Sequence, residues 1–94
     1  MALNYEQDAL NDLKEIIRYG AENGLPSPQA YVAQLMASIT VIAANPLIGR
    51  VGRVAGTREL VIAKTPYIAV YQVSGPNNAN QDVRRVLHGS QKWP

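Results

Sequence analysis

Two short segments with β-strand character, residues 59–62 and 67–73, follow one another closely and constrain the fold more than any other feature. The first is apolar and ends before Lys64-Thr65-Pro66. The second is rich in aromatic and β-branched residues, which suit a pleated, partly buried surface. So short a connection predicts an antiparallel hairpin. After a polar link, residues 82–87 predict a third strand, so we expect a three-stranded meander.

A helical pattern, with apolar residues at spacings of three and four, begins near residue 6 and is expected to end at residues 23–24. Asn4 is a candidate cap for this helix, and acidic residues crowd its first turns, where the helix dipole favours them. Before the helix, residues 2–5 could form a short edge strand, because Leu3 and Tyr5 would share one face.

A second helical pattern begins at Ser27-Pro28 and is expected to end at residues 45–46. The Ser27 hydroxyl is expected to cap free backbone amides, and Pro28 suits the first helical position because its missing donor costs nothing there. The short link between the helices predicts an antiparallel helical hairpin. Its apolar stripes need a partner surface, which the strands supply. We therefore expect an α+β fold in the order β-α-α-β-β-β, with the helical hairpin packed on a small antiparallel β-sheet.

The composition fits one globular domain over residues 1–94, because 47% of the residues are hydrophobic and no repeat or domain boundary is apparent. The chain has no cysteine and only one histidine, which excludes disulfides and thiolate zinc sites, so no metal and no cofactor are expected. No segment has the length and apolarity needed to cross a bilayer, and the start of the chain lacks the pattern of a signal peptide. The prediction is a cytoplasmic protein without a membrane partner.

The charges are unevenly distributed along the chain. Residues 1–48 carry two basic and five acidic side chains, whereas residues 49–94 carry seven basic and two acidic ones. A basic half of this kind suits an anionic partner, either nucleic acid or an acidic protein segment. The alternative is that these are solvated charges of strands and loops. Arg50, Arg53 and Arg58 are notable because guanidinium groups donate readily to phosphate or carboxylate.

The same loop, residues 49–58, contains three glycines, but it does not match a nucleotide P-loop. A P-loop connects a strand to a helix and ends in Lys-Ser or Lys-Thr. This loop leads from a helix into a strand and lacks that pair, so a turn-rich connection is the simpler interpretation.

Two residues near the chain end are further candidates. His88 is a weak candidate for a general acid or base, since the sequence positions no triad partner; a structural hydrogen bond at the end of the last strand is the alternative. Trp93 could stack on a base or enter a partner pocket, or it could clamp the chain end onto the core.

Three segments in register resemble the RelE/ParE superfamily of bacterial type II toxins: residues 49–62 (GRVGRVAGTRELVI), 65–73 (TPYIAVYQV) and 86–94 (VLHGSQKWP). The resemblance extends upstream through the helical hairpin. It implies a toxin that is neutralised by a cognate antitoxin, ParD-like or of another class, in a toxin–antitoxin hetero-oligomer. The fold that it implies agrees with the elements predicted above.

The superfamily has two kinds of target. The RelE-like branch cleaves mRNA on the ribosome, using basic side chains on the sheet to stabilise charge at the scissile phosphate. In this chain the paired lysines of RelE fall on Glu59 and Val61, and the arginine of the next strand falls on Ile68. The ParE-like branch poisons DNA gyrase and is not known as an enzyme. The resemblance therefore favours a gyrase inhibitor, with an mRNA endoribonuclease or a non-toxic antitoxin-binding member as alternatives.

This hypothesis assigns two sets of site residues. Candidates for contact with gyrase or the gyrase–DNA complex are Arg50, Arg53, Arg58, Arg84, His88 and Trp93. The antitoxin segment is expected to cross the helical hairpin and the sheet over an exposed apolar patch. The residues expected at that patch are Tyr31, Leu35 and Tyr67, for which packing in the core is the alternative.

Overall fold

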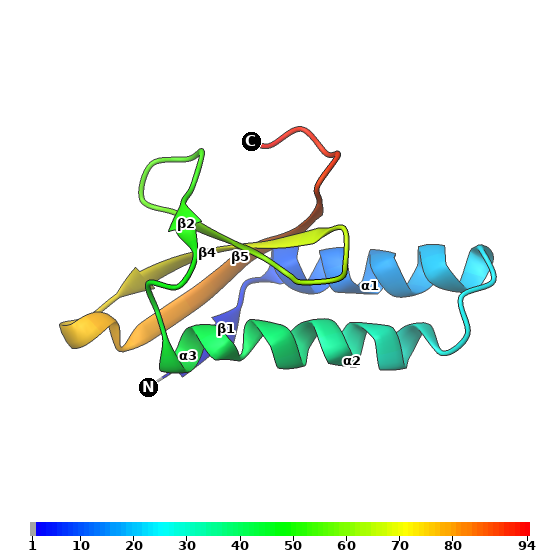
Figure 1. The fold of residues 1–94 in the computed structure, drawn as a ribbon, viewed down its shortest axis with the longest axis horizontal. Coiled ribbons are helices and arrows are strands. Elements are labelled where there is room, and N and C mark those ends of the chain that lie inside the picture. Colours follow the sequence, from blue (N-terminus) through cyan, green and yellow to red (C-terminus); the bar gives the residue numbers. More distant parts are fainter. Residues whose placement is uncertain (1) are drawn as a thin grey trace.

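The computed structural model describes residues 2–94 and contains a helical hairpin and a five-stranded sheet (Figure 1). In chain order the elements are β1 (Ala2–Tyr5), α1 (Gln7–Glu22), α2 (Pro28–Ile39), α3 (Val41–Ala44), β2 (Arg50–Val51), β3 (Arg58–Val61), β4 (Tyr67–Ser74), the 3-10 helix η1 (Pro76–Asn78) and β5 (Asn80–His88). The sheet order is β1-β5-β4-β3-β2. The predicted α+β class and the helical hairpin on a sheet are confirmed.

The sheet is mixed, because β1 pairs in parallel with β5 while the other neighbouring strands are antiparallel. The meander of β3, β4 and β5 matches the predicted three strands. The sequence did not predict the two-residue strand β2, which forms inside the glycine-rich loop and pairs with β3. Such a short edge strand leaves no hydrophobic alternation that a pattern search could detect.

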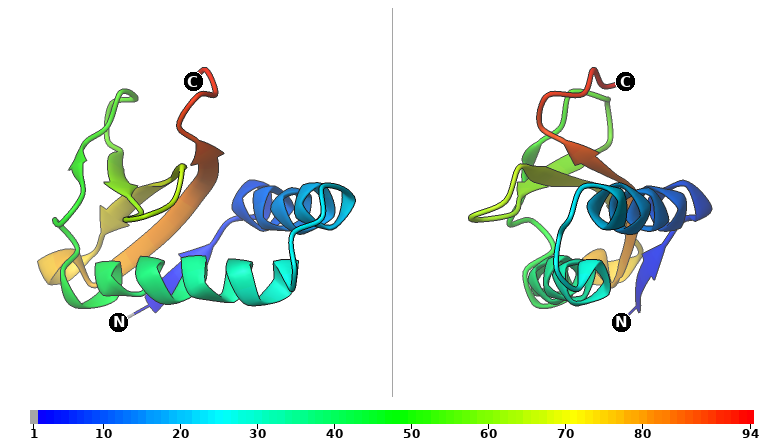
Figure 2. Two further views of the ribbon diagram at one scale, coloured as in Figure 1. Left: turned by 45° about the vertical axis from the view of Figure 1, so that its right-hand side comes forward. Right: turned by 90° about the vertical axis from the view of Figure 1, so that its right-hand side faces the viewer.

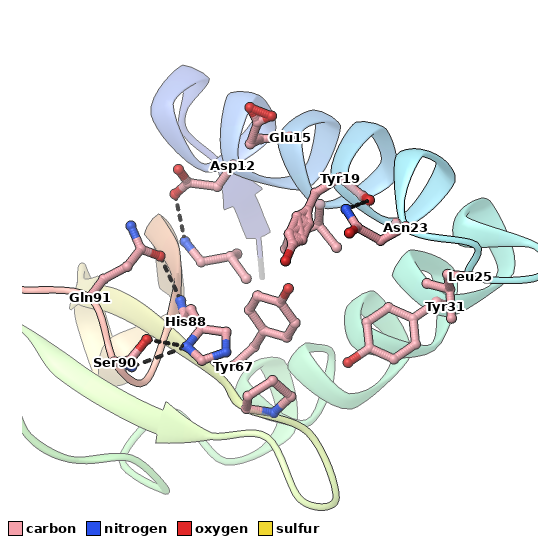
Figure 3. A pocket seen from close by; sticks show the side chains of 14 residues that line it. Asp12, Glu15, Tyr19, Asn23, Leu25, Tyr31, Tyr67, His88, Ser90 and Gln91 are labelled. Atoms are coloured by element: carbon pink, nitrogen blue, oxygen red, sulfur yellow. Dashed lines mark hydrogen bonds between the residues drawn. The ribbon is translucent and has the colours of Figure 1, made fainter.

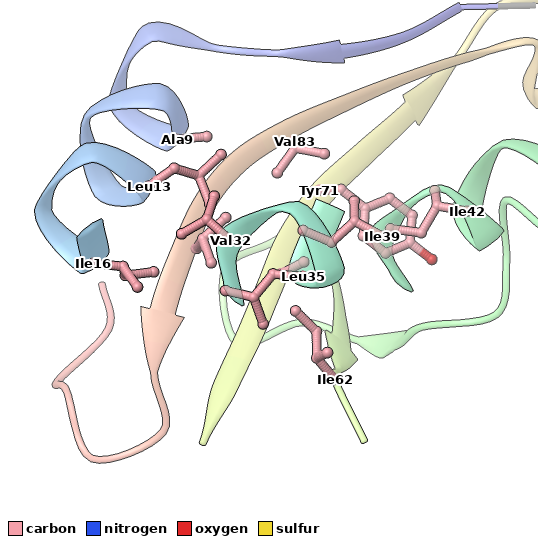
Figure 4. Packing of buried hydrophobic residues seen from close by; sticks show 12 residues of the cluster. Ala9, Leu13, Ile16, Val32, Leu35, Ile39, Ile42, Ile62, Tyr71 and Val83 are labelled. Carbon is pink, nitrogen blue, oxygen red and sulfur yellow. The ribbon is translucent and has the colours of Figure 1, made fainter. Parts of the chain in front are cut away.

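The helical hairpin covers one face of the sheet, whereas the loop between β2 and β3 and the end of the chain rise from the opposite face, which we call the outer face (Figures 1 and 2). The core lies between the hairpin and the sheet (Figure 4). Its members recur at helical spacing on α1 and α2, and on the strands they share the face towards the helices, with a register shift between β4 and β5 that separates Val83 and Val86 by three residues. They are Ala9, Leu13, Ile16, Val32, Leu35, Ile39, Ile42, Ile62, Ala69, Tyr71, Val83 and Val86. This spacing buries one stripe of each helix.

Both predicted helix caps are wrong. Asn4 belongs to β1, and the residue that precedes α1 is Glu6, whose side chain makes no capping hydrogen bond. Ser27 precedes α2 as predicted, but its backbone is left-handed, with φ of 52°, and its hydroxyl makes no capping bond. A capping serine normally has extended backbone, from which its oxygen can reach the free amides. Pro28 does occupy the first turn of α2.

The second helical segment ends at Asn45, as predicted, but it is interrupted once. The interruption between α2 and α3 occurs at Thr40, whose hydroxyl donates to the Met36 carbonyl at 2.9 Å. A threonine that bonds back to the preceding turn competes with the helical ladder and tends to bend it. Within residues 2–94 no helix is long and apolar enough to span a membrane.

Tyr71 anchors the connection between α3 and β2 to the core. Its buried hydroxyl accepts a hydrogen bond from the Gly49 amide and donates one to the Pro46 carbonyl, both at 2.8 Å. A Cβ at Gly49 would lie 2.8 Å from the Tyr71 ring, so only glycine allows this approach. The glycine therefore has a packing role at the start of the loop.

Candidate functional site

A groove of about 640 Å³ lies between the end of α1, the start of α2 and the ends of β4 and β5 that face them (Figure 3). We call it the tyrosine groove, because Tyr19, Tyr31 and Tyr67 line it together with His88 and Ser90. Each tyrosine comes from a different element, so the groove exists only when the helical hairpin is docked on the sheet.

Aromatic contacts form one wall of the tyrosine groove. The rings of Tyr31 and Tyr67 meet edge to face with centroids 6.2 Å apart, and Tyr67 meets the His88 ring in the same way at 5.6 Å. Tyr67 and His88 are cross-strand partners on β4 and β5. Burial raises the pKa of Tyr67, and the nearby Tyr31 and Tyr19 add to the rise, so this hydroxyl stays neutral near pH 7.

His88 is held by the turn that follows β5. Its Nδ1 accepts a hydrogen bond from the Ser90 amide at 3.1 Å and lies 2.7 Å from the Ser90 hydroxyl oxygen. The His88 amide donates to Gln91 Oε1 at 2.7 Å. Because a backbone amide can only donate, Nδ1 is an acceptor and the neutral ring carries its proton on Nε2. These contacts match the structural hydrogen bond that the sequence offered as the alternative to acid–base chemistry.

Arg50 and Arg53 converge on one buried carboxylate at the outer face. Glu59 is only 2% exposed. Its oxygens lie 3.0 Å from an Arg50 nitrogen and 3.2 Å from Arg53 Nε, and they also accept the Arg53 amide at 3.0 Å. Burial alone would raise the pKa of Glu59, but the Arg53 amide and the two guanidinium groups together lower it to about 2. Much of the charge on the two arginines is therefore balanced within the chain.

Arg58 lies apart from these two arginines. Its cross-strand partner in β2 is Val51, so its side chain extends from the face of β3 that carries the helices rather than the outer face. Its Nη1 donates to the Gly49 carbonyl at 2.7 Å and to the Leu47 carbonyl at 3.3 Å.

The remaining candidates near the chain end are also engaged. Arg84 pairs with Glu6 at 2.8 Å and donates to Gln72. The Trp93 ring lies 5.6 Å from the guanidinium of Arg85, a residue that the sequence analysis did not single out. The six predicted target-binding residues therefore do not form one surface, since His88 lies in the tyrosine groove and the arginines are divided between the two faces.

Arg85 connects the helical hairpin to the last strand. Its Nε and Nη2 donate to the Asp12 carboxylate at 2.8 and 3.0 Å, and the same carboxylate accepts the Val86 amide at 2.8 Å. Asp12 thus satisfies a backbone donor on β5 beyond the stretch that β1 covers. Among the seven Lys and Arg side chains of residues 49–94, all of which the structure describes, only those of Lys64 and Lys92 make no hydrogen bond or ion pair.

Two of the three predicted antitoxin-binding residues, Tyr31 and Tyr67, line the tyrosine groove. The expectation that Leu35 contributes to an exposed patch is wrong, because Leu35 is 1% exposed and belongs to the core. Tyr19, which was not predicted as a site residue, is 56% exposed and lines the same groove. Tyr19 follows the buried Ile16 by three residues, so helical spacing could have indicated it.

The three positions that correspond to the sheet cations of RelE lie together on the outer face. Val61 pairs directly with Ile68, and Glu59 is two residues before Val61 on the same strand, so their side chains share one face. Their side chains are two aliphatics and a carboxylate that is already paired. Within residues 2–94, no group of three or more His, Asp or Glu side chains is arranged to hold a metal ion.

Comparisons with known proteins agree with this architecture. A family described as "ParE toxin of type II toxin-antitoxin system, parDE" matches residues 3–93. A protein of Sinorhizobium fredii (strain NBRC 101917 / NGR234) named "Putative toxin Y4kP" is 35% identical over 86 residues, which cover 92% of this chain and 85% of that protein. A solved structure titled "Chromosomal ParDE TA system from P. aeruginosa" has a TM-score of 0.79 at 24% identity and covers 94% of this chain and 95% of that one. The last match concerns the fold alone.

Proposed function

This chain belongs to the ParE toxin family of type II toxin–antitoxin systems, and from that premise we propose that it acts as a single domain that inhibits DNA gyrase and is neutralised by a cognate antitoxin. Gyrase and the antitoxin are both soluble protein partners, so the proposed site of action is the cytoplasm. No cofactor or metal takes part in this proposal.

The choice of gyrase over mRNA rests on one observation, the side chains of Glu59, Val61 and Ile68. A nuclease of the RelE kind needs cations already positioned where negative charge develops at the scissile phosphate. The corresponding face of this sheet offers two aliphatic side chains and a carboxylate buried beneath two arginines. An anion at that place would meet no free cation from these three positions, which argues against phosphodiester cleavage there.

We propose that the target contacts the end of the molecule that carries β2 and the loop after it. Arg50, Arg53 and Arg58 come from this end, and each keeps part of its side chain accessible. Arg84, His88 and Trp93 lie elsewhere, and we keep them as secondary candidates. A basic surface of this kind attracts an acidic protein or the DNA that gyrase holds.

We propose the tyrosine groove as the antitoxin site. Tyr31 and Tyr67 line it, and the exposed Tyr19 stands at its rim. A groove lined by aromatic residues suits an antitoxin segment that folds as it binds, because tyrosines bury much apolar area while their hydroxyls keep hydrogen-bond partners. The class of antitoxin, ParD-like or another, does not change this proposal.

Expression in cells separates the two targets. If gyrase is the target, the chain should activate a DNA-damage reporter before protein synthesis declines, because trapped cleavage complexes are broken DNA. If mRNA is the target, incorporation of labelled methionine should collapse first and the reporter should stay silent. An unrelated inhibitor of translation serves as the control. The second pattern would contradict the gyrase proposal.

Hydrogen exchange tests the antitoxin site. We expect the purified antitoxin encoded beside the toxin to slow amide exchange around Tyr19, Tyr31 and Tyr67 while exchange in β2 changes little. Tyr67→Ala should weaken antitoxin binding about tenfold or more, as expected for an aromatic residue at the centre of an interface. Unchanged exchange in the helical hairpin would show that the antitoxin binds elsewhere.

A further inference from the structure

Three exposed aliphatic side chains occur where the chain passes from α3 into β2, and two of them, Leu47 and Ile48, also line a hollow beside η1. Leu47 is 52% exposed, Ile48 is 48% exposed and Val51 is 79% exposed. Arg58 lies among them, since it bonds to the Leu47 carbonyl and is the cross-strand partner of Val51. We call Leu47, Ile48, Val51 and Arg58 the β2 patch.

The β2 patch differs from an ordinary sheet edge. β2 is the last strand in the sheet order, and within residues 2–94 no strand pairs with its outer side. Proteins usually protect such an edge with charged side chains that discourage association. β2 is only two residues long and carries Arg50, so the edge strand has this protection, yet Val51 and the aliphatic side chains of Leu47 and Ile48 remain exposed beside it. Clustered exposed apolar side chains are typical of interaction surfaces.

The side-chain charge of the segment around the β2 patch is positive. No Asp or Glu occurs between Glu22 and Glu59, and Glu59 itself is buried under Arg50 and Arg53. The β2 patch therefore carries the charge of Arg58 without an exposed carboxylate from that stretch, while Arg50 and Arg53 lie on the outer face. The complementary partner is acidic.

Arg58 is already positioned to meet an acidic group. Its Nη1 is held by the Gly49 and Leu47 carbonyls, while its Nε and Nη2 have no hydrogen-bond partner within the described chain. A guanidinium fixed at one nitrogen loses little further freedom when it binds a carboxylate through the others. The surrounding aliphatic side chains would exclude water and strengthen that contact.

The β2 patch lies far from the tyrosine groove. Tyr31 is in the first turn of α2, whereas Leu47 follows α3 at the other end of the same helical segment (Figure 1). At 1.5 Å per residue the two ends are separated by roughly 20 Å. Two different proteins can therefore occupy the two surfaces.

We propose that the β2 patch is the docking surface for the protein target of this toxin, and that the target presents there a carboxylate flanked by aliphatic side chains. This inference rests on the proposed function, in which that target is gyrase. The patch fits protein better than DNA, because phosphates would gain nothing from three aliphatic side chains. A second copy of this chain fits poorly, because two-fold pairing of this edge would bring Arg50 of β2 close to its own copy.

The test measures the affinity of purified gyrase, without DNA, for the wild-type toxin and for three single variants. Ile48→Glu and Val51→Glu place a negative charge on the β2 patch. The matched control is Val61→Glu, because Val61 is 53% exposed but lies on the outer face of β3. We expect Ile48→Glu and Val51→Glu to weaken gyrase binding about tenfold or more, and Val61→Glu to change it less than about twofold. Affinity for the antitoxin should stay unchanged in all three, which also shows that they are folded.

Several results would overturn this inference. Equal gyrase affinity of wild type, Ile48→Glu and Val51→Glu would exclude the β2 patch while leaving the proposed function intact. Loss of antitoxin binding instead of gyrase binding would assign the patch to the antitoxin. Binding that appears only when DNA is added, or a monomer–dimer equilibrium abolished by Val51→Glu, would identify DNA or a second copy as the occupant. If the wild-type toxin neither binds gyrase nor alters DNA cleavage by gyrase, both the proposed function and this inference are wrong.

Discussion

Glu59 connects the strand β3 to the loop that follows β2. Its buried carboxylate bonds to Arg50, to Arg53 and to the Arg53 amide, so it holds the loop after β2 against the sheet. The two arginines are about half exposed, so solvent screens their attraction to the Glu59 carboxylate. The carboxylate itself is almost fully buried, so the loss of its partners would be costly.

We predict that Glu59→Gln lowers the free energy of unfolding by about 2 kcal/mol, because two guanidinium groups lose their partner and a neutral amide replaces a paired charge. Urea denaturation measures the change. Glu22→Gln is the control, since Glu22 pairs with Arg18 on the exposed surface of α1 and its loss should cost less than about 0.5 kcal/mol. Equal losses in both variants would contradict the role assigned to Glu59.

The same carboxylate should make stability depend on pH. The folded pKa of Glu59 is lowered to about 2, whereas an unfolded glutamate titrates near about 4.3. Its contribution is therefore complete above the unfolded pKa and is lost as the pH falls towards the folded pKa. Urea midpoints measured from about pH 5 down to about pH 2, a range that spans this window, should fall more steeply for wild type than for Glu59→Gln. Parallel curves would contradict the assignment.

Tyr71 gives a third test at the scale of one residue. Tyr71→Phe keeps the ring in the core but removes the hydroxyl that joins the Gly49 amide to the Pro46 carbonyl. We expect a loss of about 1–3 kcal/mol, because a buried amide is left without an acceptor. Thermal unfolding measures it, and Tyr19→Phe, at an exposed position, should have little effect.

At the scale of elements, Asp12 joins α1 to β5. It accepts two hydrogen bonds from Arg85 and one from the Val86 amide. We predict that Asp12→Ala destabilises the chain by about 2 kcal/mol and accelerates exchange of the Val86 amide. Glu22→Ala at the exposed end of the same helix is the control, because Glu22 pairs with Arg18 and not with β5. Normal protection of Val86 in Asp12→Ala would contradict this contact.

The elements themselves could largely be predicted from the sequence, because helical and strand periodicity are local. The contacts that assemble them could not. The parallel pairing of β1 with β5 and the bond from Asp12 to Arg85 join distant parts of the chain, and no local pattern encodes them. The Ser27 cap failed for a local reason, since its left-handed backbone turns the hydroxyl away from the helix amides.

At the scale of the whole molecule, the candidate site could be predicted only in part. Tyr31 and Tyr67 are partly buried and line the groove, whereas Leu35, one turn after Tyr31 on the same side of α2, is buried in the core. The sequence does not show where along this apolar stripe the groove ends. The arginines could be identified from the sequence, whereas the register of β2 and β3 decides that Arg50 lies opposite Glu59 and that Arg58 faces the other way.

The arrangement gives the molecule two separate ends, one with the tyrosine groove and one with the β2 patch. An antitoxin in the groove would then neutralise the toxin by changing its shape or by covering more than the groove, rather than by competing for one small site. A toxin–antitoxin complex that still binds gyrase weakly would be consistent with this separation.

Gyrase inhibition is tested most directly by plasmid cleavage with purified gyrase and ATP, with and without the toxin. We expect the toxin to cause accumulation of linear DNA that remains covalently attached to gyrase until protease is added, and we expect an equimolar amount of antitoxin to prevent it. Unchanged plasmid topology and no linear DNA, with toxin shown to be folded by its binding to the antitoxin, would contradict gyrase as the target.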